Sequence, residues 1–181
     1  MIILDPDLES DDSITSSKAK ARRSAAFSSR AQSQSNRIPS ARTLTRFLRE
    51  AQTAVKLRGQ VTVLLTTDRE IRRLNRQFRG KNKATDVLSF PTAKPSQVSK
   101  ARHGAPVVAG DLAISVDTAR KQAVAMRHAL AVEIKVLMLH GLLHLAGYDH
   151  ETDDGEMARR EERLRAKLRL PHGLIERSVR A

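Results

Sequence analysis

The sequence feature that most constrains the fold is an apolar segment, residues 129–146, with hydrophobic residues nearly all round when it is drawn as a helix. Such a helix belongs at the centre of a domain, because none of its faces suits water. His140 and His144 interrupt the apolar pattern. Since residues four apart project from the same face of a helix and differ by ~6 Å in height, both imidazoles can reach one point. We expect a central helix that presents two histidines together.

A third histidine follows the end of this segment. Gly147 is the type of residue that takes a left-handed conformation at a helix end, so the chain can turn back and bring His150 to the same point. The sequence has no cysteine, which excludes thiolate ligands and disulfides. Three neutral imidazoles leave the fourth position of a tetrahedral zinc ion open to water, as in catalytic sites. The sequence predicts one Zn²⁺ ion held by His140, His144 and His150.

The alternative for any single histidine is an ordinary core or surface side chain. Three of the six histidines fall within eleven residues, however, and unpartnered imidazoles in an apolar helix cost free energy. Nearby acids could accept hydrogen bonds from the outer ring nitrogens; the candidates are Asp149, Glu151, Asp153 and Asp154. Gly141 stands where a metalloprotease helix has its glutamate base, so peptidase chemistry stays open only if an acid such as Glu151 replaces it.

The remaining elements alternate in type along the chain. Hydrophobic periodicity and turn residues predict strands at 2–4, 61–66, 86–90 and 110–116, and helices at 40–58, 68–79, from 117 onward, 129–146 and 153–170. We expect strand 2–4 at a sheet edge, and we expect Asp68 and either Asp117 or Thr118 to cap helices. The pattern predicts an α+β fold, in which a small mixed β-sheet packs with helices around the central apolar helix.

The predicted domain covers residues 1–170, followed by a C-terminal tail at 171–181. Within it, residues 9–37 are rich in Ser, Ala and Arg and have too few large apolar side chains to offset the entropy of ordering, so a flexible insertion is expected. The later half of this insertion, residues 18–37, is basic and contains no acid. A solvated insertion and an RNA-contacting arm are both open interpretations.

The charge balance indicates a polyanionic partner. Thirty-three Lys and Arg against twenty Asp and Glu give a formal charge of +13, which attracts nucleic acid. Nucleic acid is therefore the expected partner. A membrane is not expected, because the chain has no ~20-residue apolar run and no basic amphipathic anchor. The acidic N-terminal sequence has no signal-peptide pattern, and together with the lack of cysteine it predicts a cytoplasmic protein; the sequence does not predict the oligomeric state.

Three sequence blocks resemble the YbeY family of endoribonucleases. The string from His140 to His150 matches the family motif H-G-x-L-H-L-x-G-Y-D-H throughout. The segment 75–91 resembles the family's R-G-x-x-x-x-T-D-V-L-S-F-P block, and residues 110–115 resemble its G-D-x-x-I-S strand. The blocks stand in the family's order, and the resemblance covers roughly residues 40–165.

This resemblance implies a zinc-dependent, single-strand-specific endoribonuclease that acts in rRNA maturation at the 16S rRNA 3′ end and in ribosome quality control. It implies RNA and the small ribosomal subunit as partners, with no DNA expected. It also implies the three histidines as zinc ligands and Arg79 as the catalytic residue that stabilises the phosphate. By position alone, Arg79 would be a solvated residue after a helix. Thr85, Asp86 and Ser89 also match family positions, but we interpret them as turn and strand residues.

The alternative function is a non-catalytic, RNA-binding ribosome-assembly factor whose zinc site is structural. The sequence assigns no general base or acid and no cleavage site, and nickel or copper could also occupy a three-histidine site. No aromatic platform strands of an RNA-reading module are recognisable, so we expect specificity to come from RNA shape or from the ribosome.

Overall fold

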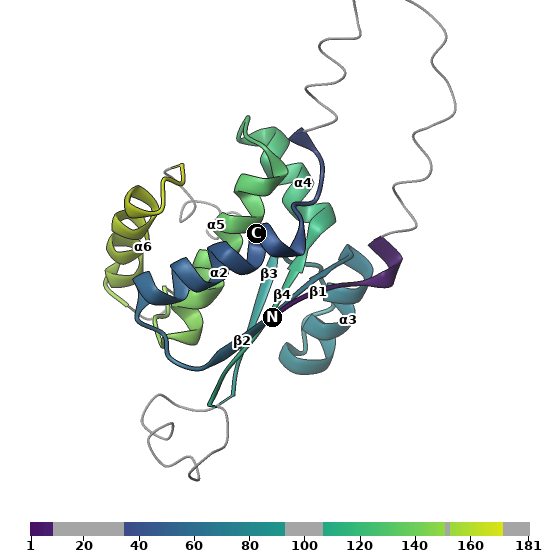
Figure 1. The fold of residues 1–181 in the computed structure, drawn as a ribbon. Coiled ribbons are helices and arrows are strands. Elements are labelled where there is room, and N and C mark those ends of the chain that lie inside the picture. The colour runs from purple at the N-terminus through teal and green to yellow at the C-terminus, as the bar shows by residue number, and fades with distance from the viewer. Residues whose placement is uncertain (9–34, 93–106, 151–152, 172–181) are drawn as a thin grey trace, which may run out of the picture.

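The computed structural model describes residues 1–8, 35–92, 107–150 and 153–171. The elements in chain order are β1 (Ile2–Leu4), the 3-10 helix η1 (Pro6–Leu8), α2 (Ala41–Val55), β2 (Gln60–Thr66), α3 (Asp68–Arg79), β3 (Val87–Pro91), β4 (Val108–Ser115), α4 (Val116–Ala125), α5 (Leu130–Leu145) and α6 (Glu156–Lys167), as Figure 1 shows. Every predicted element is present, with bounds that differ by a few residues. Most of the 9–37 insertion, the segment 93–106, Glu151 and most of the 171–181 tail lie outside the described residues.

The four strands form one mixed sheet with the order β1-β2-β4-β3. Strands β1, β2 and β4 run parallel, and β3 is antiparallel to β4. The predicted α+β architecture is therefore confirmed, and β1 lies at an edge as expected. Helices α2 and α5 lie on one side of the sheet, and α3 lies on the other (Figure 1).

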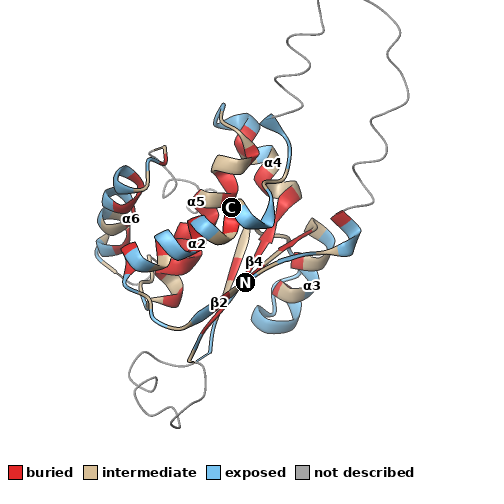
Figure 2. Ribbon diagram, in the orientation of Figure 1, coloured by how far each residue is buried: buried red, intermediate tan, exposed pale blue. Residues whose placement is uncertain are grey.

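Alternation along β4 separates two cores of unequal size. Leu112 and Ile114 join a large cluster with α2 and α5, whereas Ala113 joins a small cluster with Ile71 of α3 and Leu88 of β3. Helix α5 is buried along nearly its whole length (Figure 2). The central apolar helix therefore lies where the sequence predicts it. Among the described residues, no helix alone is long and apolar enough to cross a membrane; α4 and α5 meet that length and composition only as a pair bent by 113°.

The predicted helix caps are wrong by one to three residues. Thr67, not Asp68, caps α3, and Ser115, not Asp117 or Thr118, caps α4; each cap oxygen accepts from a backbone N–H three residues on. In both places a strand leads almost directly into a helix, so the capping residue lies at or just after the strand end. The Asp68 carboxylate instead accepts hydrogen bonds from the Ser115 and Thr118 hydroxyls.

Two glycines set how closely α5 approaches the sheet. Gly110 in β4 has a φ of 147°, and a Cβ there would lie 2.4 Å from the Phe90 carbonyl oxygen and 2.8 Å from Leu145. Gly141 in α5 has the same role from the helix side, because its Cβ would lie 2.7 Å from a Leu112 methyl carbon and 3.3 Å from Ser89 Oγ. The last turns of α5 are thus pressed against β3 and β4.

Candidate metal centre

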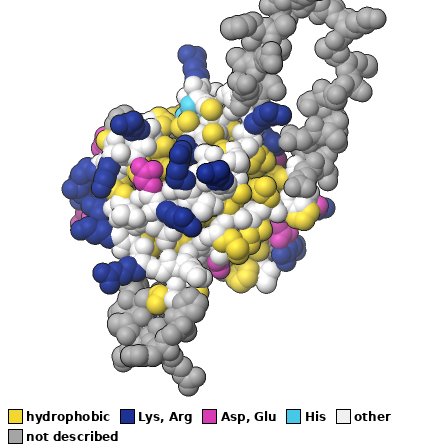
Figure 3. Space-filling view, viewed as in Figure 1, with side chains coloured by type: hydrophobic (Ala, Val, Ile, Leu, Met, Phe, Trp, Pro, Cys, Tyr) yellow, Lys and Arg dark blue, Asp and Glu magenta, His cyan; other side chains and the backbone are white. Residues whose placement is uncertain are grey.

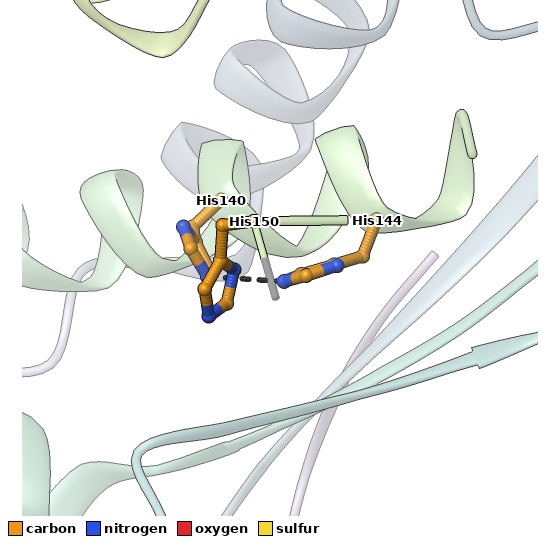
Figure 4. A group of neighbouring side chains, drawn as sticks. All are labelled: His140, His144 and His150. Carbon is orange, nitrogen blue, oxygen red and sulfur yellow. Dashed lines mark hydrogen bonds between the residues drawn. The ribbon is translucent and has the colours of Figure 1, made fainter. Parts of the chain in front are cut away.

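The end of α5 and the turn after it bring the three predicted histidines together. His140 and His144 occupy the last turns of α5, and Gly147 has a φ of 93°, the left-handed conformation expected from the sequence. The chain then turns back, and His150 reaches the other two rings (Figure 4). The predicted cluster is therefore present. It is the one group within the described part of the chain whose His, Asp or Glu side chains have the spacing of a metal site.

The spacing of the ring nitrogens suits a single ion. One nitrogen from each ring lies within 4.8 Å of the others, and His140 Nε2 and His144 Nε2 are 3.2 Å apart. In a tetrahedral zinc site with Zn–N bonds of about 2.0–2.1 Å, two nitrogens are about 3.4 Å apart. The helical pair is thus at ligand spacing, and the third ring needs only a small movement.

The hydrogen-bond partners of the Nδ1 atoms show which nitrogen of His140 and of His144 carries the proton. His140 Nδ1 lies 2.9 Å from Glu161 Oε2, and His144 Nδ1 lies 3.0 Å from the Tyr148 carbonyl oxygen. Because a carboxylate and a carbonyl only accept, both Nδ1 atoms carry the hydrogen, and in neutral rings both Nε2 atoms have only a lone pair. Two lone pairs 3.2 Å apart share no proton and repel each other. A cation between them relieves this repulsion, so the donor set fits a metal ion.

The surroundings of His150 and the pKa of His144 also favour a metal ion at this cluster. His150 Nδ1 is buried and has no hydrogen-bond partner among the described residues, an arrangement that costs free energy unless a ligand satisfies it. Burial lowers the pKa of His144 to about 4, with further lowering from His140 and His150. The ring is therefore neutral near pH 7, and its nitrogen is free to bind a metal.

The sequence analysis missed the acid that orients His140. Glu161 of α6 is fully buried, accepts the His140 Nδ1 hydrogen, and also accepts from Arg165 Nε at 2.8 Å. Burial raises the pKa of Glu161, but the hydrogen bond from His140 and the hydrogen bonds and positive charge of Arg165 outweigh it and lower the pKa overall. The available signal was an acid on the buried face of the last helix, which also carries Met157 and Leu164.

Of the acids proposed from the sequence, Asp153 has another role. Its carboxylate accepts from the backbone N–H groups of Gly155 and Met157, both at 2.8 Å, and so holds the start of α6. Asp149 lies close enough to His144 to oppose the lowering of that pKa. Asp154 contributes its carbonyl oxygen to a hydrogen bond from Arg159, and Glu151 lies outside the described residues.

Close packing explains the glycine after the first histidine. Ser89 Oγ donates to the Gly141 carbonyl at 3.4 Å, and the Leu112 side chain fills the space that a Cβ at Gly141 would need. A side chain at this position would press against the Leu112 methyl groups and Ser89 Oγ, so glycine suits this close approach.

Arg79 and the three histidines come from different elements. Arg79 is the last residue of α3, is exposed, and its side chain makes no hydrogen bond or ion pair within the described ranges. Its helix packs on the sheet face opposite α5. The neighbouring Phe78 contacts Phe90 of β3 in a T-shaped ring pair with centroids 5.1 Å apart. The edge strand β3 contacts both α3 and α5.

The other residues that match family positions have structural partners. Asp86 accepts from the Thr85 hydroxyl at 3.2 Å, from the Val87 backbone N–H at 2.8 Å and from Gln122 Nε2 at 2.9 Å. Thr85 and Asp86 thus fix the start of β3 against α4. These contacts agree with leaving both residues out of the catalytic set.

Comparisons with known proteins point to one family. A family model described as "Endoribonuclease YbeY" matches residues 27–169. A relative from Koribacter versatilis is 49% identical over 141 residues, which cover 78% of this chain and 86% of the relative. One from Solibacter usitatus is 51% identical over 134 residues, 74% of this chain and 83% of the relative. Both are named "Endoribonuclease YbeY". A solution structure of a Thermotoga maritima protein is 29% identical, with a TM-score of 0.49, and covers 72% of this chain and 85% of that one.

Proposed function

Because this chain belongs to the endoribonuclease YbeY family, we propose that it is a zinc-dependent, single-strand-specific endoribonuclease. Its substrate is rRNA, at the 3′ end of 16S rRNA, and its partner is the small ribosomal subunit, as the family resemblance implies. The observation that carries the proposal is the cluster of three imidazoles, in which the facing Nε2 atoms of His140 and His144 have no proton to share.

One Zn²⁺ ion is the proposed cofactor, with His140, His144 and His150 as its ligands. When bound, zinc supplies a Lewis acid and activates water at neutral pH. Glu161 and the Tyr148 carbonyl hold the first two rings so that their Nε2 lone pairs converge. A set of three protein ligands supports catalysis more than a structural role, because structural zinc sites are closed by four.

Arg79 is the proposed catalytic residue that neutralises charge on the phosphoryl oxygens. Its guanidinium is exposed and has no partner in the described residues, so its donors are available to a phosphate. The net charge of +13 supports RNA as substrate, and Figure 3 shows Lys and Arg side chains spread over the α2 and α6 face with few acids among them. Because α3 and α5 lie on opposite faces of the sheet, RNA that contacts both Arg79 and the histidine cluster has to pass the edge strand β3.

The proposal extends to the organisation of the protein. Residues 1–170 form one domain, since the described elements share one sheet and its two cores. The protein works in the cytoplasm, where its rRNA substrate is located.

Cleavage of a 16S rRNA precursor by metal-quantified protein tests the proposal. Wild type should cut, and His144→Ala should lose both bound zinc and cleavage. Arg79→Gln should keep its zinc and bind RNA but cut roughly 10²-fold more slowly, the loss typical of a transition-state charge contact. Arg73→Gln is the matched control, because Arg73 lies on the same helix and is paired with Glu70.

The same assay identifies the alternative function. If folded wild type and variants bind RNA equally and none cuts, even with small ribosomal subunits supplied, the protein is a non-catalytic assembly factor. A peptide substrate in a parallel reaction tests the peptidase interpretation, which predicts cleavage of the peptide and none of the RNA.

A further inference from the structure

Helix α3 carries a row of arginines without partners. Arg72, Arg76 and Arg79 follow one another at intervals of four and three residues, so they lie along one line of the helix. All three are exposed, and none of their side chains forms a hydrogen bond or ion pair with a described residue. The acids of this helix are engaged elsewhere, since Asp68 binds Lys121 and Glu70 binds Arg73. The row is uncompensated positive charge.

The neighbouring line of the same helix is different. Arg69 is paired with Asp7, and Arg73 is paired with Glu70. One helix thus has neutralised and free arginines side by side. This contrast separates the row from a generally solvated basic face and supplies a matched control of equal charge.

The loop after α3 extends the row. Lys81 and Lys83 are exposed, and the loop is fixed to the helix by Asn75, whose Nδ2 donates to the Lys83 carbonyl at 2.7 Å. The Lys81 N–H in turn donates to the Asn75 carbonyl at 3.3 Å. The two lysines are therefore held next to the arginines.

An exposed aromatic side chain lies at the end of the row. Phe78 shares the helical spacing of Ile71 and Leu74, yet 59% of it is exposed. Its ring contacts Phe90 in a T-shaped arrangement with an interplanar angle of 69°, and more than half of the side chain stays open to solvent. An open ring beside free cations has the chemistry that binds single-stranded nucleic acid, since bases stack on the ring and phosphates pair with the cations. In a duplex the base faces are already stacked on one another, so they are not available to stack on such a ring.

We propose that the α3 surface, comprising Arg72, Arg76, Phe78, Lys81 and Lys83, binds single-stranded RNA next to the metal centre. Phe78 stacks on a base, and the cations hold the adjoining phosphates. The proposal rests on the proposed function in so far as this RNA is the enzyme's substrate.

The route from the α3 surface to the metal centre is short. Phe78 contacts Phe90 of the edge strand β3, and the preceding residue, Ser89, points to the opposite face of the strand. There its hydroxyl contacts the Gly141 carbonyl, one residue from His140. RNA that crosses this edge would reach both places.

The role of the cations is tested by measuring how the full chain binds a single-stranded RNA that contains 2-aminopurine at several salt concentrations. Arg72→Gln/Arg76→Gln and the control Arg69→Gln/Arg73→Gln remove the same charge from the same helix. Removing two phosphate contacts should reduce the slope of log K against log salt by about 1.4, at about 0.7 per contact, whereas the control should keep the wild-type slope. Equal slopes in the two double variants would overturn the proposal.

Two substitutions of Phe78 test the stacking. Phe78→Leu keeps an apolar side chain but removes the aromatic face, so binding should weaken about fivefold or more, and the 2-aminopurine quenching should be lost. Phe78→Tyr should restore both, and thermal unfolding confirms that each variant is folded. Wild-type affinity and quenching in Phe78→Leu would overturn the proposal.

Cleavage measured on the same samples separates this proposal from the proposed function. If wild type cuts while all variants bind alike, the α3 surface has no role and the endoribonuclease stands. If the variants lose binding as expected but wild type does not cut, the surface stands and the endoribonuclease fails.

Discussion

The two faces of the sheet treat polar side chains in opposite ways. On the α5 face, His140, Glu161 and Arg165 are buried next to the large core and bonded to one another. On the α3 face the core is small, and Arg72 and Arg76 are exposed and unpaired within the described residues. Burial requires each polar group to have a partner, whereas water allows charges to stay free for a ligand. The first face is thus suited to fixing geometry, and the second to making contacts.

The largest expected effect is on the buried face. Glu161→Ala leaves Arg165, only 3% exposed, without its carboxylate, so the free energy of unfolding should fall by about 3–5 kcal/mol in urea titrations. Zinc affinity should also fall by roughly 10- to 100-fold, because His140 loses its orienting acceptor. The exposed Glu50→Ala is the control. A loss under about 1 kcal/mol would show that burial does not fix this network.

A pH titration of chelator-treated protein should give the next largest effect. The pKa of His144 is lowered from 6.5 to about 4 in the folded protein. Between these two pH values the imidazole is protonated in the unfolded chain and neutral in the folded chain. Stability should therefore fall between pH 6.5 and 4, by about 2 kcal/mol because partial exposure reduces the full linkage value.

The variants of the two faces separate the source of this pH dependence. His144→Gln should weaken it, and Arg72→Gln/Arg76→Gln should leave it unchanged. The lowered pKa of Glu161 adds a loss of the same sign at still lower pH. A flat profile in wild type above pH 4 would contradict the assignment to His144.

Gly141→Ala tests how tightly α5 is pressed on the sheet. Overpacking against Leu112 costs ~1–3 kcal/mol and exceeds the ~1 kcal/mol gain in helix propensity, so a net loss of about 1 kcal/mol is expected. Thermal unfolding measures the loss, and Leu112→Val in the same chain should recover part of it. A Gly141→Ala protein more stable than wild type would show that α5 is not tightly packed against Leu112 at this position.

The smallest effect is expected on the exposed face. Arg72→Gln/Arg76→Gln should change the free energy of unfolding by less than about 0.5 kcal/mol and leave zinc content unchanged, because exposed charges without partners contribute little to stability. Chemical denaturation and metal analysis check both quantities. A loss above about 1 kcal/mol would remove the contrast between the two faces.

Most of the fold was predictable because its signals are local. The periodicity of residues 129–146 gave the central helix, and short β-branched runs gave the strands. The caps at Thr67 and Ser115 were missed, since the structure places each at or just after a strand end and a sequence pattern locates such boundaries poorly. Phe78 shares the spacing of core residues, but only the packed structure shows that its ring extends past the small core.

The sequence by itself determined the histidine cluster. His140, His144 and His150 lie within eleven residues, and the geometry of one helix and one glycine turn fixes their separation. The tertiary structure alone decided that Glu161, twenty-one residues beyond His140, is its buried partner, and that the arginine row of α3 lies on the other face of the sheet. The physical reason is that hydrogen bonding within a helix and turn is local, whereas burial and pairing between distant residues depend on which elements pack together.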